Sequence, residues 1–183
     1  MESLITIRDL HIQFGNTSVL EGVNLDLHRG ENLVVLGKSG TGKSVLIKCI
    51  VGLLLPDQGE ICIDNRNVLE MKEEELAGIR QRIGFLFQSG ALYDSMTVRE
   101  NLAFPLVKVQ KMKDQAQINE KIEKALEEVG LPDAIDKMPS ELSGGMRKRI
   151  GLARTLIVEP EIILYDEPTT GLDPITATEI SQL

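Results

Sequence analysis

The chain has 183 residues, of which 42% are hydrophobic, and a formal net charge of −8 at pH 7. It is long enough for one sizeable core and short for two full domains. The acidic balance argues against a nucleic-acid partner, which is normally bound by a basic surface, and neither a secretory signal nor an apolar run near the ~18 residues of a membrane span is visible.

Three stretches in the first third of the chain favour strands. Residues 3–14 alternate between apolar and polar side chains and end at a Gly-Asn turn signal, residues 19–27 alternate again, and residues 59–64 form one more short run. Together they predict a small antiparallel layer. Cys49 and Cys62 lie within apolar runs, so we expect two buried thiols in a reducing compartment rather than a disulfide or a metal site.

A phosphate-binding loop lies among these strands. Residues 37–44 read G-K-S-G-T-G-K-S, which is the G-x-x-x-x-G-K-S pattern of a P-loop. Residues 32–36 before it suit a buried strand, and residues 45–51 after it suit a helix. Its glycines let backbone N–H groups point at phosphate oxygens, Lys43 reaches the β- and γ-phosphates, and the Ser44 hydroxyl ligates Mg²⁺. The expected nucleotide-binding residues are Gly37, Lys38, Ser39, Gly40, Thr41, Gly42, Lys43 and Ser44. The alternative is an ordinary Gly-rich turn.

The second half of the chain is predicted to be mostly helical. A capping-box pattern, T-x-x-E, predicts a helix start at Thr97. Apolar side chains at helical spacing predict a helix over residues 118–129, and Ser143 precedes a further one. Strands are expected at residues 82–88 and 161–165, on either side of these helices.

Two later motifs narrow the class of P-loop protein. Residues 142–146 read L-S-G-G-M, and residues 166–173 read D-E-P-T-T-G-L-D directly after the apolar run. With the P-loop, this ordered set resembles the ATP-binding-cassette (ABC) ATPases, whose signature, Walker B and D-loop motifs stand in this order. The resemblance covers nearly the whole chain. It implies an α/β fold, with a RecA-like P-loop NTPase core, a small antiparallel β layer and a helical insertion.

The resemblance also implies one ABC ATPase domain over residues 1–183 that is incomplete at its C-terminus. We expect the antiparallel layer in residues 1–27 and 58–70, the RecA-like core in residues 28–57, 71–90 and 155–183, and the helical subdomain in residues 91–154. The family carries a switch histidine beyond Walker B, whereas His11 and His28 both precede the P-loop. We therefore expect the histidine and the strand leading to it to be missing, and the chain alone to be a poor ATPase.

Further roles follow from the resemblance. Asp166 would organise Mg²⁺ at the end of a strand, and Glu167 would act as general base for the attacking water. Gln88 resembles the Q-loop glutamine, which touches Mg²⁺ or the water and relays the nucleotide state to a membrane partner. Phe14 stands where the family has an aromatic residue that stacks on adenine, with a core position as the alternative. The expected catalytic residues are Glu167, Gln88 and Lys43, and the expected metal ligands are Ser44, Gln88 and Asp166.

The signature motif implies a dimer. Ser143, Gly144 and Gly145 begin a helix, whose N-terminus favours anions, and in ABC ATPases this site faces the ATP of a partner subunit. Two chains then enclose two ATP molecules head to tail, and Asp173 resembles the D-loop aspartate that crosses the interface. The alternative is a plain helix cap.

Met146 replaces the usual signature glutamine and points to one branch. The run L-S-G-G-M-R-K-R and residues 87–101 resemble phospholipid-transport cassettes of the MCE or Mla type. This implies an ATPase motor for phospholipid or a related lipid, on the cytoplasmic inner face of a cell membrane. It uses ATP and Mg²⁺ and works as a homodimer with an MCE-type component and a permease contacted through the Gln88 region. The alternatives are a soluble ABC protein acting on ribosomes or DNA, and a P-loop kinase or GTPase, which the L-S-G-G motif disfavours.

Overall fold

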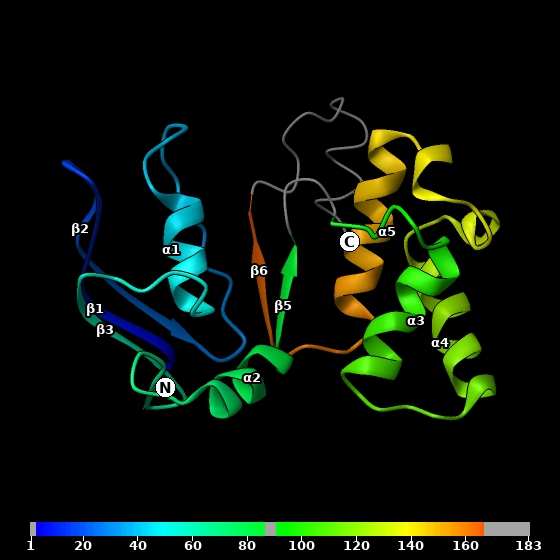
Figure 1. The fold of residues 1–183 in the computed structure, drawn as a ribbon, viewed down its shortest axis with the longest axis horizontal. Helices are drawn as coiled ribbons and strands as arrows, with labels where there is room; N and C mark the ends of the chain where they lie inside the picture. Colours follow the sequence, from blue (N-terminus) through cyan, green and yellow to red (C-terminus); the bar gives the residue numbers. More distant parts are fainter. Residues whose placement is uncertain (1–2, 87–90, 167–183) are drawn as a thin grey trace. The chain divides into compact units, whose positions relative to one another are not determined.

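The computed structural model describes residues 3–86 and 91–166, and the chain divides into two compact units, Met1–Arg80 and Gln81–Leu183 (Figure 1). Among these described residues, no helix is long and apolar enough to cross a membrane. The first elements in chain order are β1 (Ser3–Phe14), β2 (Thr17–His28), α1 (Lys43–Ile50), β3 (Gln58–Ile63), β4 (Arg66–Asn67) and α2 (Glu73–Gln81). The remaining elements are β5 (Ile83–Leu86), α3 (Val98–Lys108), α4 (Gln115–Glu128), η1 (Pro132–Ala134), η2 (Pro139–Glu141), α5 (Gly144–Leu156) and β6 (Ile162–Tyr165).

The strands of the first unit form an antiparallel sheet in the order β2-β1-β3-β4. Ile5 and Ile7 of β1 are buried, and so are Leu10 and Ile12. The two pairs differ in parity because the register shifts between them, around Asp9, whose φ is +47°. A shift of one residue along a strand exchanges the residues that face the two sides of the sheet. Odd-numbered Ile5 and Ile7 are therefore buried before the shift, and even-numbered Leu10 and Ile12 are buried after it. The antiparallel layer expected from the sequence is confirmed.

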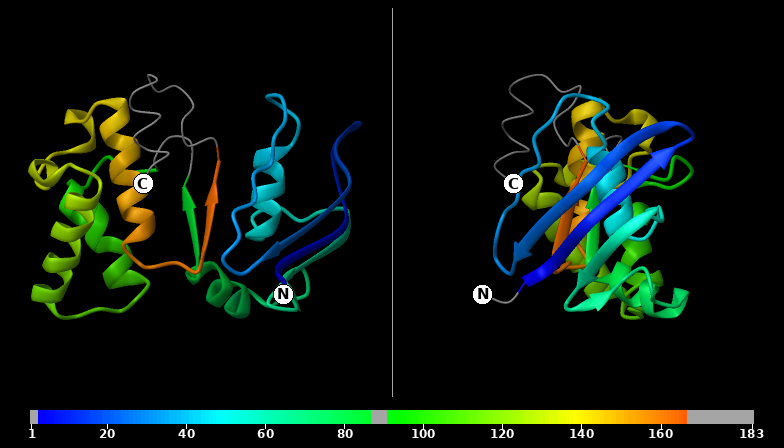
Figure 2. Two further views of the ribbon diagram at one scale, coloured as in Figure 1. Left: turned by 180° about the vertical axis from the view of Figure 1, so that it is seen from behind. Right: turned by 90° about the vertical axis from the view of Figure 1, so that its left-hand side faces the viewer.

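Helix α1 lies against one face of this sheet (Figure 2). It buries Leu46, Cys49 and Ile50. Burial raises the pKa of the Cys49 thiol to about 11, because a thiolate is poorly solvated in an apolar interior. Cys49 and Cys62 are both free, as expected, although Cys62 is only half-buried.

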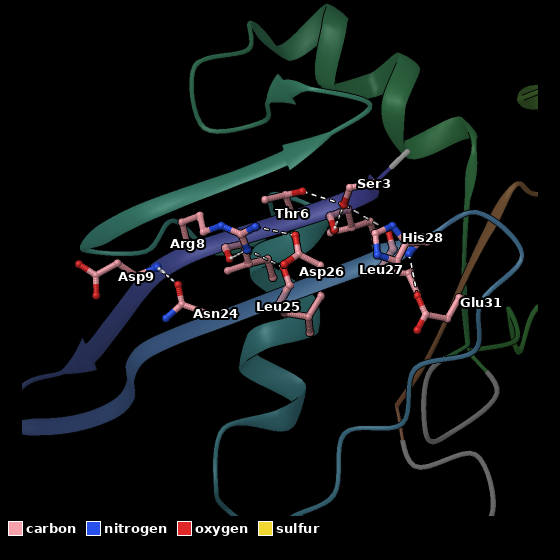
Figure 3. A network of polar contacts seen from close by, with 12 residues as sticks. Ser3, Thr6, Arg8, Asp9, Asn24, Leu25, Asp26, Leu27, His28 and Glu31 are labelled. Atoms are coloured by element: carbon pink, nitrogen blue, oxygen red, sulfur yellow. Dashed lines mark hydrogen bonds and ion pairs between the residues drawn. The ribbon is translucent and has the colours of Figure 1, made fainter. Parts of the chain in front are cut away.

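A polar network ties β1 to β2 on the exposed side of the hairpin (Figure 3). The Arg8 guanidinium donates to the carbonyl oxygens of Ile7 and Leu25 over 2.9 and 3.3 Å, and to Asp26 Oδ1 over 2.7 Å. The hydrogen bond from Arg8 lowers the pKa of the Asp26 carboxyl. Because both side chains are open to solvent, this pair adds little stability.

The strand expected at residues 32–36 is not formed, so that prediction was wrong. Its side chains are exposed, with Val34 at 74% and Leu36 at 88%. A strand needs a neighbour for its backbone hydrogen bonds. The described strands of the first unit pair with one another, and none pairs with this stretch. An apolar run alone cannot reveal whether such a neighbour exists.

The second unit contains a parallel pair of strands, with Ile83 of β5 opposite Ile162 of β6. Arg82 and Glu161, which precede the two strands, form a two-pronged ion pair, Nε to Oε1 at 3.0 Å and Nη2 to Oε2 at 2.7 Å. Such a bidentate pair has defined geometry and sets the register at the start of the pair. Strands in both places were expected from the sequence.

Helix α5 lies between these strands and the pair α3–α4 (Figure 1). The helices share an apolar core of buried side chains, among them Leu102, Leu106, Ile118, Ile122, Leu126 and Ile150. The Thr97 capping box is present, because the Thr97 hydroxyl accepts from the Glu100 N–H while the Glu100 carboxylate accepts from the Thr97 N–H. Helix α4 ends at Glu128, and Gly130 just beyond has φ of +67°. The expected helices at these positions are confirmed.

Candidate functional site

The P-loop of residues 37–44 forms a tight turn that leads into α1. The Thr41 N–H donates to the Lys38 carbonyl over 3.4 Å, and Gly40 within this turn has φ of +83°. Gly42, the N-cap of α1, has φ of +90°. Glycine adopts both conformations without strain. Gly42 has no side chain to cap the helix, so the positive end of the α1 dipole lies at the loop without a side-chain cap from that residue.

The Lys43 side chain folds back over this loop. Its Nζ donates to the carbonyl oxygens of Gly37 and Lys38, over 2.9 and 3.0 Å. The Lys38 carbonyl also accepts from the Thr41 hydroxyl over 2.9 Å. The Lys43 ammonium is therefore held at the loop that the sequence assigns to phosphate binding.

Two of the loop glycines have close neighbours on the side where a Cβ would lie. A Cβ on Gly42 would lie 2.9 Å from the Val19 carbonyl oxygen and as near to the side chains of Val19 and Leu20. A Cβ on Gly37 would lie 2.7 Å from Thr41 Oγ1. The first contact places the start of α1 directly on β2, so the antiparallel sheet positions the P-loop.

Phe14 lies at the end of β1, opposite Thr17 across the hairpin, and is 50% exposed. An aromatic ring that is half open to solvent has a face available for stacking, whereas a core residue would be buried. The exposure favours the stacking role over a core position, and the role itself stays a prediction.

Asp166 directly follows β6, as the sequence predicts. Its N–H donates to the Leu86 carbonyl over 3.1 Å, which continues the parallel ladder by one step. The backbone of Asp166 is thus fixed at the carboxyl ends of both strands, the edge where α/β proteins bind ligands. Gln88, Glu167 and Asp173 lie outside the described residues, so their roles stay predictions.

Ser143 is the N-cap of α5, and its Oγ accepts from the Met146 N–H over 3.2 Å. Ser143 and Gly144 are exposed, and a Cβ on Gly144 would meet no atom within 4 Å. The Met146 side chain packs against the helical core, which a glutamine amide would do less well. The helix end is therefore accessible within its own unit, as an anion site requires.

Two residues to which the sequence assigned no role brace the segment that precedes α3. Asn101 is fully buried; its Oδ1 accepts from the Tyr93 N–H over 2.8 Å, and its Nδ2 donates to the carbonyls of Tyr93 and Met96. Arg154 of α5 donates to the Ala91 carbonyl and stacks on the Tyr93 ring, 4.6 Å from its centroid. In the sequence, the one signal for this role was Asn101 itself, a polar residue on an otherwise apolar helix face.

The family comparison agrees with these motifs. A family model described as ABC transporter matches residues 20–170. The match begins in β2, contains the P-loop and Ser143, and extends past Asp166.

The chain belongs to the ABC transporter family.

The names of individual ABC relatives describe different roles. The chain is 46% identical to Protein TRIGALACTOSYLDIACYLGLYCEROL 3, chloroplastic, of Arabidopsis thaliana, covering 98% of this chain and 54% of that protein. It is 47% identical to the probable ribonucleotide transport ATP-binding protein mkl of Mycobacterium leprae, covering 98% and 51%. It is 39% identical to the intermembrane phospholipid transport system ATP-binding protein MlaF of Haemophilus influenzae, covering 100% and 69%. The chain thus spans about half the length of the first two relatives.

Solved ABC cassettes share the fold. The dimeric structure of MJ0796, a bacterial ABC transporter cassette, is 33% identical with a TM-score of 0.89, and covers 97% of this chain and 80% of that one. A post-hydrolysis state of MJ0796 bound to ADP and phosphate has a TM-score of 0.88 at 32% identity, with the same coverage of both chains. The P-loop NTPase fold with an antiparallel layer and a helical insertion is confirmed.

Proposed function

We propose that the chain is the ATP-binding part of an ABC transporter motor that hydrolyses ATP to ADP and phosphate. The observation that carries this is the P-loop, where Lys43 is held by two loop carbonyls at the uncapped start of α1. A helix N-terminus, inward N–H groups and an ammonium together bind polyphosphate. Phe14 then stacks on the adenine ring.

We propose Mg²⁺ as the metal that accompanies ATP. Within residues 3–86 and 91–166, no three His, Cys, Asp or Glu side chains group as a metal site. Mg²⁺ is usually held by one or two protein oxygens together with substrate phosphates and water. The Ser44 hydroxyl, the Asp166 carboxylate and the Gln88 amide oxygen would hold it. Bound there, it would neutralise charge on the phosphates.

Hydrolysis is proposed to need a second copy of the chain. Glu167 takes a proton from the attacking water as general base. The exposed start of α5 at Ser143 adds its helix dipole to the γ-phosphate held by the partner's P-loop, and Asp173 crosses the interface. The dimeric cassettes of MJ0796 support this arrangement.

The transported molecule is proposed to be a phospholipid or a related lipid. Two relatives support this, because one is named after a galactolipid and the other for phospholipid transport. The mkl relative is named for ribonucleotide transport instead. We place the chain on the cytoplasmic face of a membrane, with a permease contacted through the Gln88 region and an MCE-type lipid-binding partner.

A nucleotide titration tests the ATP-binding role. Lys43→Ala removes the ammonium that binds the β- and γ-phosphates, so we expect the affinity for ATP to fall about 10- to 150-fold, as for the loss of a charged hydrogen-bonding partner. Lys48→Ala, about one and a half turns further along α1, is the matched control and should bind like the wild type. Equal affinity of the Lys43→Ala and wild-type proteins would contradict the proposal.

A further inference from the structure

The Lys38 carbonyl oxygen is the point at which the P-loop is held together. It accepts from the Thr41 N–H over 3.4 Å, from the Thr41 hydroxyl over 2.9 Å and from Lys43 Nζ over 3.0 Å. The hydroxyl bond is shorter than the backbone bond of the same turn. The side chain of Thr41 therefore holds this turn more closely than its backbone does.

The Thr41 hydroxyl also explains why residue 37 is glycine. A Cβ on Gly37 would lie 2.7 Å from Thr41 Oγ1 and 3.9 Å from Lys43 Cδ. The hydroxyl thus lies over the Gly37 Cα, on the side where the Lys43 chain passes. Threonine suits this place because its branched Cβ restricts χ1, so the hydroxyl has few other orientations.

We propose that Thr41 is a positioning residue that keeps the P-loop in shape when Lys43 turns from the loop to a phosphate. In the structure, Lys43 and Thr41 share the Lys38 carbonyl. When a phosphate attracts the ammonium, the Thr41 hydroxyl still satisfies that carbonyl, and the loop does not have to rearrange. This role of the side chain rests on the proposed ATP-binding function and goes beyond it, since backbone N–H groups bind the phosphates.

Two substitutions separate the hydroxyl from the shape of the side chain. Thr41→Val keeps the branched shape and removes the hydroxyl, whereas Thr41→Ser keeps the hydroxyl. We expect Thr41→Val to weaken ATP binding about 3- to 10-fold, the size of one net hydrogen bond, and Thr41→Ser to bind nearly as the wild type does. The melting temperature should stay unchanged in both, because Thr41 is exposed. Equal affinity of the Val and Ser variants overturns the proposal, and so does an affinity loss that only follows a lower melting temperature.

A measurement without nucleotide keeps this test independent of the ATPase proposal. Amide hydrogen exchange over residues 37–44 should be faster in Thr41→Val than in the wild type, and unchanged in Thr41→Ser. Gly37→Ala should also speed exchange strongly, but less so in a Thr41→Ala background, where the 2.7 Å contact is gone. Equal exchange in all variants overturns the positioning role. Loss of ATP binding by the wild type, with the exchange pattern retained, would instead reject the ATP-binding function alone.

Discussion

Position 42 imposes two constraints that only glycine, among the amino acids, satisfies together. Its φ is +90°, and a Cβ would lie 2.9 Å from the Val19 carbonyl oxygen, an atom that cannot move aside without disturbing β2. A side chain at this position therefore both strains the backbone and pushes the P-loop away from the sheet.

We expect Gly42→Ala to lower the free energy of unfolding by about 1–3 kcal/mol and to abolish nucleotide binding. Gly78→Ala is the matched control, because Gly78 lies within α2 and a Cβ there meets no atom within 4 Å. That change should stabilise the protein by about 0.5–1 kcal/mol, since alanine favours helix over glycine. Urea unfolding measures both. A Gly42→Ala protein as stable as the wild type would refute the close contact with β2.

In the second unit, Asn101 is the residue whose replacement we expect to cost the most stability. It is the one buried polar residue among those described, and its amide satisfies backbone groups of Tyr93 and Met96. Asn101→Ala would leave these groups without partners in an apolar surrounding, so we expect a loss of about 1–3 kcal/mol in the free energy of unfolding. Asn119→Ala removes a half-buried side chain of α4 that accepts one solvent-exposed hydrogen bond from Gln115, and should cost less than about 0.5 kcal/mol. Equal losses in the two variants would mean that the buried network contributes nothing.

At the scale of elements, α5 combines three features: an exposed N-terminus, a buried face in the helical core, and Arg154, which contacts Ala91 and Tyr93. Its N-cap is Ser143, and its buried face includes Ile150 and Ala153. The start of the helix is exposed, and the proposed partner's phosphate would meet it there. Charge at this position should therefore affect hydrolysis without affecting the fold of the helix.

Ser143→Asp tests this separation. Aspartate caps a helix as well as serine does, so we expect an unchanged melting temperature and unchanged ATP binding to the chain's own P-loop. The added negative charge should repel the partner's γ-phosphate and slow hydrolysis by at least about tenfold, equivalent to ~1.4 kcal/mol. Ser140→Asp introduces the same charge in η2, three residues earlier, and serves as the control. Normal hydrolysis by the Ser143→Asp protein would argue against catalysis across the interface.

At the scale of the whole molecule, Cys49 reports on the integrity of the first unit. The thiol lies on the buried face of α1 and is completely covered, and burial raises its pKa from 9.0 to about 11. Because the folded pKa is the higher one, the contribution of Cys49 to stability is fully present below pH 9 and is lost as the pH rises toward 11.

We expect Cys49 to resist alkylation by iodoacetamide at pH 8 in the native protein and to react at once in urea. Cys62 is the internal control: it is half-buried, with a pKa raised mainly by burial, and should react slowly in the native state. Mass spectrometry of the labelled peptides distinguishes the two sites. Alkylation of Cys49 as fast as that of Cys62 would show that the face of α1 that carries Cys49 is not buried in the native protein.

The sequence by itself determined the local chemistry of this ABC family member. The P-loop pattern, the Thr97 capping box, the Ser143 cap and Asp166 at a strand end depend on neighbours close in the chain, so short patterns suffice to predict them. The antiparallel layer was also predictable, because alternation with period two is a property of the strand itself.

Only the tertiary structure decided the features that depend on distant neighbours. Residues 32–36 have the composition of a buried strand but lack a strand partner in their unit, and no local pattern reports a missing partner. The bulge at Asp9, the contact of Gly42 with Val19 and the burial of Asn101 likewise join residues that are paired by the fold. Backbone hydrogen bonds and van der Waals contacts depend on the distance between two groups in the folded chain, not on their separation in the sequence. A local sequence pattern does not contain that distance.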